Sequence, residues 1–171
     1  MALVVEDGTG LTNADSYLSE ADADTYVAAH GADAVWTAAL TADKEEALRL
    51  ATQALDAQYG GQWRGLRAND TQALDWPREN AEDDDGYAID DESVPTALEH
   101  ACAELAVKEV NGDTLVADLT NPGAVKRELR KVGPITKEDE YVGGKSQIKS
   151  YRLVEMLLRP LIHPSNQVAR A

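Results

Sequence analysis

Apolar residues recur at helical spacing in the middle of the first half of the chain. Four of them, three or four residues apart, would share one face of a helix: Leu48, Ala51, Leu55 and Tyr59. The pattern predicts a helix over about 42–59, with Thr41 as its N-cap and Gly60-Gly61 as its end.

Further helices are predicted over about 20–29, 34–40, 95–110 and 151–158. Ser19 is a suitable N-cap for the first, and Pro95 suits the first position of the third. Cys102 lies on the apolar stripe of that third helix, where a small core residue is expected. Because the core must be built from Ala, Leu and Val, the chain is predicted to be mainly α, a small helical bundle.

A long loop over 60–93 interrupts the helical pattern, and a loop of this length needs anchors. A tryptophan ring can pin a loop to a helical core. The residues expected to act as structural anchors are Trp36, Trp63, Trp76, Pro77 and Pro95.

The last fifty residues have a weaker pattern. Residues 125–132 are compatible with helix or strand, and Gly143-Gly144 predicts the turn of a short β-hairpin. Pro160 and Pro164 predict an extended C-terminal tail. We expect one domain over 1–171, with a helical body over about 19–112, an arm over about 121–150, and a C-terminal helix and tail over 151–171.

Charge divides the 171 residues unevenly. Residues 1–122 carry 6 basic and 26 acidic residues, a net charge of -20, whereas residues 123–171 carry 10 basic and 5 acidic residues, a net charge of +5. One interpretation is a solvated acidic surface. The other is a dipolar molecule whose basic end docks on the acidic face of a neighbour, and repeated contacts of this kind can close into a ring.

A basic cluster stands out in the second region: Lys126, Arg127, Arg130 and Lys131. With Tyr141 and Tyr151 downstream, it could contact single-stranded nucleic acid. We favour a docking surface for an acidic protein face, because the net charge of -15 repels phosphate.

Catalytic chemistry is not indicated. Gly144-Lys145-Ser146 lacks the earlier glycine of a phosphate-binding loop, and the three histidines lack the spacing of a zinc site. The acidic run Glu82–Glu92 could hold calcium, but Ala81 occupies the first ligand position, so a solvated loop is favoured. We therefore expect no enzyme, no cofactor and no metal.

Several motifs, in order, resemble the head-tail adaptor (connector) proteins of long-tailed phages and prophages. The resemblance covers about residues 3–162. The matching segments are Val5–Tyr17, Trp63-Arg64-Gly65, Leu74–Arg78, Val94-Pro95 and Val132–Ile135. Some relatives of that kind carry a DnaT-like single-strand DNA-binding label instead.

The resemblance implies a structural virion protein at the capsid–tail junction. It implies a ring of about twelve copies beneath the portal, which extends the DNA channel and joins the next connector ring or the tail. Genomic DNA would pass through without sequence-specific binding. The alternative is a single-stranded DNA-binding accessory protein of replication. No membrane span or signal peptide is evident, so we expect synthesis and assembly in the bacterial host cytoplasm.

Residue roles follow from the adaptor hypothesis. The contact between copies would join the basic cluster to acids of the loop: Asp83, Asp84 and Asp85. Docking on the portal would use the C-terminal helix and tail: Tyr151, Arg152, Arg159, His163 and Arg170.

Overall fold

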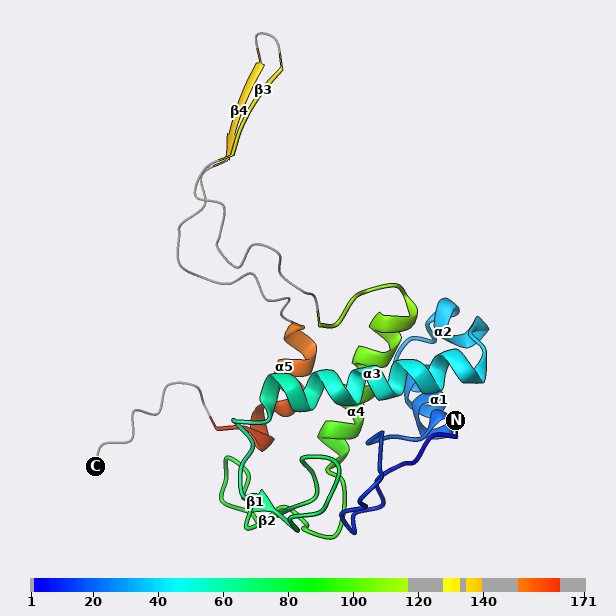
Figure 1. Ribbon diagram of the computed structural model, residues 1–171, viewed down its shortest axis with the longest axis vertical. Coiled ribbons are helices and arrows are strands. Elements are labelled where there is room, and N and C mark those ends of the chain that lie inside the picture. Colours follow the sequence, from blue (N-terminus) through cyan, green and yellow to red (C-terminus); the bar gives the residue numbers. More distant parts are fainter. Residues whose placement is uncertain (1, 117–127, 133–134, 140–150, 164–171) are drawn as a thin grey trace, which may run out of the picture. The chain divides into compact units, whose positions relative to one another are not determined.

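The computed structural model describes residues 2–116, 128–132, 135–139 and 151–163 (Figure 1). The chain divides into two compact units: Met1–Leu115 with Tyr151–Ala171, which we call the body, and Val116–Ser150, which we call the arm unit. The described ranges are mainly helical with a small two-stranded hairpin, which confirms the predicted fold class. None of the helices in these ranges has the length and apolar character to cross a membrane.

Two short helices, α1 (Glu20–Ala29) and α2 (Ala34–Ala38), begin at polar caps. Ser19 Oγ accepts the backbone N–H of Asp22 at 3.1 Å, as predicted for the start of α1. Asp33 Oδ1 accepts the N–H of Trp36 at 2.8 Å and begins α2 in the same way. Both starts are therefore fixed by side chains close to them in sequence.

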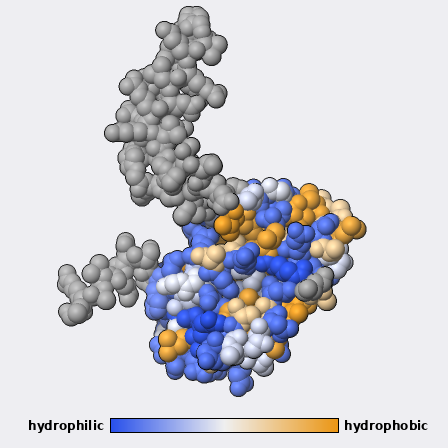
Figure 2. Space-filling view, viewed as in Figure 1, coloured by the Kyte–Doolittle hydropathy of each residue, from blue (hydrophilic) through white to orange (hydrophobic). Residues whose placement is uncertain are grey.

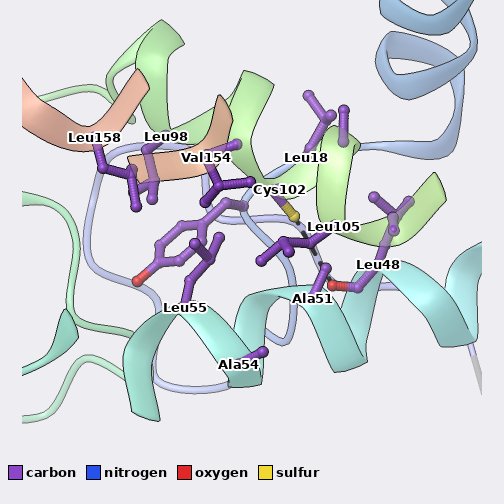
Figure 3. Close-up of a cluster of buried hydrophobic side chains, with 14 of the residues drawn as sticks. Leu18, Leu48, Ala51, Ala54, Leu55, Leu98, Cys102, Leu105, Val154 and Leu158 are labelled. Carbon is purple, nitrogen blue, oxygen red and sulfur yellow. Dashed lines mark hydrogen bonds between the residues drawn. The ribbon is translucent and has the colours of Figure 1, made fainter. Parts of the chain in front are cut away.

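The centre of the core lies between α3 (Thr41–Tyr59) and α4 (Thr96–Val110), which cross in Figure 1. Figure 3 shows the leucines and alanines of α3 facing Leu98, Cys102 and Leu105 of α4. Cys102 is fully buried, and its Sγ lies 3.4 Å from Thr52 Oγ1. The predicted apolar stripes are thus the faces that pack together, and each buried leucine contributes about 1.5–3 kcal/mol.

Two helix boundaries differ from the prediction by one residue. Thr41 is the first residue of α3 and not its cap, because the N-cap is Leu40, which makes no side-chain capping bond. Pro95 is the N-cap of α4 and not its first helical residue. A proline suits either position, since its fixed φ is compatible with both and it has no N–H to satisfy.

The C-terminal end of the body is formed by α5 (Arg152–Leu158) and a 3₁₀ turn, η1 (Arg159–Leu161). Val154 and Leu158 are buried, and α5 packs against α4. The prediction of extended chain at Pro160 is wrong, because this proline lies in the first turn of η1, where its φ fits a helix. The rest of the predicted tail, 164–171, lies outside the described residues.

The segment between α3 and α4 has little regular structure. Strands β1 (Leu66–Arg67) and β2 (Arg78–Glu79) form one short antiparallel pair. Trp63 and Trp76 lie buried, with ring centroids 6.1 Å apart and ring planes at 83°. Trp63 Nε1 also donates to Asp75 Oδ2 at 3.2 Å, so this residue contributes both an apolar ring and a polar link.

In the arm unit, β3 (Glu128–Val132) pairs antiparallel with β4 (Ile135–Asp139). Val132 lies opposite Ile135, so the hairpin connection falls at 133–134. The hairpin that the sequence predicts across Gly143-Gly144 lies outside the described residues, and the described hairpin joins 128–132 to 135–139 instead. The sequence analysis did not consider a turn at Gly133-Pro134, although two residues are the commonest hairpin connection.

Candidate interaction surfaces

Three of the sequence motifs and helices meet at the side chain of Tyr17. Tyr17 Oη donates to Asp56 Oδ1 at 2.5 Å and accepts the backbone N–H groups of Asp75 and Trp76 at 3.1 and 3.3 Å. The opening motif, α3 and the Leu74–Arg78 motif therefore meet at one hydroxyl group. We call this set of residues, Tyr17, Asp56, Asp75 and Trp76, the motif junction.

Burial controls the ionisation of the motif junction. Desolvation raises the pKa of Asp56 to about 6; the hydrogen bond from Tyr17 opposes this rise, and the negative charge of Asp75 adds to it. Desolvation, followed by the charge of Asp56, raises the pKa of Tyr17 well above its usual value. The junction is a buried polar network that holds the loop on α3.

The opening motif is closed by the carboxylate of Glu6, which is 4% exposed. Its oxygens accept the backbone N–H groups of Gly8, Gly10 and Leu11 at 3.1, 2.8 and 2.9 Å. Gly8 has φ +95°, and a Cβ there would lie 2.0 Å from the carbonyl oxygen of Glu92. The motif residues Glu6 and Gly8 thus fold the N-terminal segment and fit it against the end of the acidic run.

Cationic groups of the body are engaged with the protein itself. Lys44 Nζ lies 2.7 Å from Asp24 Oδ1, and Arg49 Nε lies 2.8 Å from Asp15 Oδ2. Three arginines lie in the loop: Arg64, Arg67 and Arg78. Their guanidinium groups donate mainly to backbone carbonyl oxygens. The sixth basic residue of 1–122, Lys108, is exposed. The body therefore presents mostly carboxylates to its surroundings.

The acidic loop (Glu82–Glu92) is organised by its own carboxylates. Asp83 Oδ1 accepts the backbone N–H groups of Asp85 and Tyr87, both at 2.9 Å. Asp84 pairs with Arg64, and its other oxygen lies 3.6 Å from Arg159 Nε. Within the described ranges, no group of three or more residues could hold a metal ion.

This arrangement separates residues that the sequence analysis grouped and joins residues that it assigned to different partners. Asp84, expected at a contact between copies, and Arg159, expected at the portal, form an ion pair within one chain. Asp85 is exposed, and the carboxylate of Asp83 accepts a backbone N–H group of its own loop. The short spacing of the three aspartates gave no sign that their carboxylates would have such different partners.

The C-terminal helix presents an exposed mixed face. Leu153 and Met156 are 51% and 63% exposed, and Arg152 and His163 are also exposed. Tyr151 is half-buried. The backbone N–H of His163 donates to the carbonyl of Gln62 at 2.8 Å, which fixes the end of this element on the body. Arg170 lies outside the described residues.

The basic cluster falls on the arm unit. Arg130 and Lys131 lie in β3, and the register places Arg130 opposite Lys137 of β4. Lys126 and Arg127 lie outside the described residues. The hairpin thus adds Lys137 to the four cationic residues that the sequence analysis grouped from neighbouring positions, and its strands also carry three acids, Glu128, Glu138 and Asp139.

Two histidines flank one tyrosine. The Tyr26 ring stacks on His30 with centroids 4.1 Å apart, and His100 lies 4.5 Å from its centroid. Tyr26 Oη donates to Glu104 Oε1 at 2.9 Å. Burial, and then the neighbouring His30, lower the pKa of His100. No sequence pattern indicated this contact, because it joins α1 to α4 across about seventy residues.

Comparison with known proteins gives one assignment. No curated protein and no solved structure matches the chain significantly. A family described as "Putative DnaT-like ssDNA binding protein" matches residues 1–171. The chain therefore belongs to this DnaT-like family.

Proposed function

We propose that this protein is a head-tail connector of a long-tailed phage, a structural virion protein that forms a ring beneath the portal. The observation that carries the proposal is the contrast in net charge between residues 1–122, at -20, and residues 123–171, at +5, whose basic cluster falls in the arm unit. A chain with two unlike, complementary surfaces makes head-to-tail contacts with its copies, and such contacts form a ring when the rotation closes.

The internal engagement of the body's arginines supports this function. Since Lys44, Arg49, Arg64 and Arg78 bind the protein's own oxygens, the body offers few cations to phosphate. Carboxylates facing a channel would let genomic DNA slide without adhering, because phosphate is repelled from them. The opposite arrangement, free arginines on a groove, is what retention of DNA requires.

The outer face of α5 supports a contact with the portal. Leu153 and Met156 supply exposed apolar surface beside Arg152, while Val154 and Leu158 hold the helix on the body. An apolar patch with a cationic edge on a fixed helix is typical of a protein–protein contact. The next connector ring or a tail protein would use the other side of the ring.

A second function, binding of single-stranded DNA in replication, is favoured by the description of the family. On this chain it would depend mainly on the cationic residues of the arm unit, since Lys44, Arg49 and Arg78 of the body are engaged. Its affinity should fall steeply with added salt, because phosphate contacts release counterions.

One pair of measurements separates the two functions. Mass photometry would follow the 18.5 kDa chain alone and with the portal protein of the same genome. The connector proposal predicts a portal particle that gains about twelve copies. Fluorescence anisotropy with labelled oligothymidine would be measured across a salt series. A portal that gains no mass, together with salt-sensitive DNA binding, would replace the connector with the replication function.

A further inference from the structure

An apolar groove of about 670 Å³ lies between α2, the first half of α3 and the end of α4. Its apolar lining includes Val35, Ala38, Ala47, Leu50 and Val110. Figure 2 shows apolar side chains gathered over the end of the body that carries α2. Val35 and Leu50 are 49% and 36% exposed, so the groove leaves large apolar side chains in contact with solvent.

Three carboxylates line the same groove: Asp43, Glu46 and Glu109. None of them lies in an ion pair within the part of the chain that the structure describes. The neighbouring cations of α3, Lys44 and Arg49, pair with acids outside the groove. The groove therefore fits an occupant that carries both apolar residues and positive charge.

The groove residues of α3 form a stripe of their own along that helix. Asp43, Glu46, Ala47 and Leu50 follow one another at the spacing i, i+3, i+4, i+7, while Leu48 belongs to the stripe that faces α4. Amphipathic helices bind in grooves of this kind through residues at the same spacing. The stripe therefore indicates a helical occupant.

Charge disfavours three other kinds of occupant. The carboxylates repel the phosphates of nucleic acid and the headgroups of an anionic membrane. The same groove on a second copy would bring like charges together, since residues 1–122 carry a net charge of -20. A cationic protein segment is the occupant that remains.

We infer that the groove binds an amphipathic helix of another protein, one with lysine or arginine beside its apolar stripe. The apolar stripe would cover Val35 and Leu50, and the cations would face Asp43, Glu46 and Glu109. The inference rests on the proposed function, because the next connector ring or a tail protein would supply the helix. Figure 1 shows α2 and α5 near opposite ends of α3, so the groove lies away from the face proposed for the portal.

A model helix tests the inference on the full chain. The probe is a synthetic amphipathic peptide of about 14 leucine and lysine residues, which forms about four helical turns. Two-dimensional NMR of the ¹⁵N-labelled protein should show the largest amide shifts at Val35, Leu50 and Val110. A matched peptide with glutamate in place of lysine should bind at least about tenfold more weakly. Shifts centred on the acidic loop, or equal binding of the two peptides, would overturn the inference.

Charge reversal separates the groove from the overall charge of the protein. Glu46→Lys with Glu109→Lys should lower the affinity for the lysine peptide about tenfold. The matched control is Asp85→Lys with Asp91→Lys, which makes the same change in net charge at two exposed positions of the acidic loop. The control should keep the wild-type affinity. Equal losses in the two variants would show attraction by overall charge alone and would refute the inference.

The apolar part of the contact has its own pair of variants. Val35→Ser should weaken peptide binding several-fold, because it removes an exposed apolar side chain from the groove. Leu66→Ser removes one that is 69% exposed outside the groove lining, and it should leave the affinity unchanged. An unchanged affinity for Val35→Ser would contradict the proposed contact.

The portal distinguishes failure of this inference from failure of the proposed function. The chain with Glu46→Lys and Glu109→Lys should still add about twelve copies to the portal in mass photometry, because its α5 face is unchanged. Loss of the ring would place a neighbouring copy in the groove and overturn the inference. A portal that gains no mass with the wild-type chain would refute the proposed function, whereas peptide binding is measured without the portal.

Discussion

Replacing Asp56 by asparagine should change how stability depends on pH. Asp56 is largely buried at the motif junction, and its pKa is raised from 3.8 to about 6, first by desolvation. The native protein therefore keeps this proton to a higher pH than the unfolded chain does. Between about pH 4 and pH 6, unfolding releases the proton, so the free energy of unfolding contributed by this group falls as pH rises.

The size of the effect follows from the two pKa values. A shift of about two pH units corresponds to about 3 kcal/mol, fully present below pH 4 and lost above pH 6. Asparagine keeps an oxygen that can accept the hydroxyl of Tyr17, but its amide group would face the backbone N–H of Asp75. That mismatch should lower the free energy of unfolding by about 1–3 kcal/mol at every pH. The ionisation of Asp56 is therefore measured by how the difference between variant and wild type changes with pH, and not by its size at one pH.

Urea unfolding, followed by tryptophan fluorescence at pH 4, 5, 6 and 7, measures the slope. The free energy of unfolding of Asp56→Asn minus that of wild type should rise by about 3 kcal/mol between pH 4 and pH 7. Asp70→Asn removes one exposed carboxylate from the same loop and serves as the control. Profiles of wild type and Asp56→Asn that stay parallel within about 0.5 kcal/mol would refute a buried, proton-retaining Asp56.

Three further variants test other parts of the body. Leu48→Ala, at a fully buried position, should lower the free energy of unfolding in urea by about 2–5 kcal/mol. Leu50→Ala should lower it far less, because Leu50 is 36% exposed. Glu6→Gln places an amide donor against backbone N–H groups and should lower the free energy of unfolding by about 2–3 kcal/mol in the same assay. An unchanged urea midpoint would contradict the role of the Glu6 carboxylate in folding the N-terminal segment. The lowered pKa of His100 beside His30 means that the unfolded chain takes the proton first. Wild type should therefore lose melting temperature relative to His100→Gln as pH falls from about 7 to 5, and equal losses would contradict this pKa shift.

Periodicity and caps in the sequence were sufficient to predict the helices. The stripe of Leu48, Ala51 and Leu55 identified α3, and Ser19 fixed the start of α1, because these signals act over a few residues. Boundaries moved by one residue where a cap had no side-chain bond, as at Leu40. Helix caps and apolar stripes can be recognised in a single sequence because the residues that form them are neighbours along the chain.

Contacts between distant segments were not predictable in this way. Tyr17 meets Asp56 and Asp75, and Asp84 meets Arg159, across separations that no local pattern reports. The described hairpin, 128–132 with 135–139, was not predicted, because Gly143-Gly144 is a stronger turn signal than Gly133-Pro134 and the flanking alternation did not discriminate. The apolar surface groove lined by α2, α3 and α4 forms only where the three helices meet. Its residues therefore could not be distinguished from core residues in the sequence.

The motif residues named in the sequence analysis are mainly interior ones. Glu6 closes the opening segment, Tyr17 gathers three motifs at one hydroxyl, and Trp63 and Trp76 fill the loop's underside. Such residues determine a fold, and a fold supports more than one function. What distinguishes a ring-forming connector from a DNA-binding protein must therefore lie on the surfaces: the acidic surface of the body, the exposed face of α5 and the basic cluster of the arm unit. Variants at these surfaces, which leave the motif junction intact, are the ones whose loss of function would report on function and not on folding.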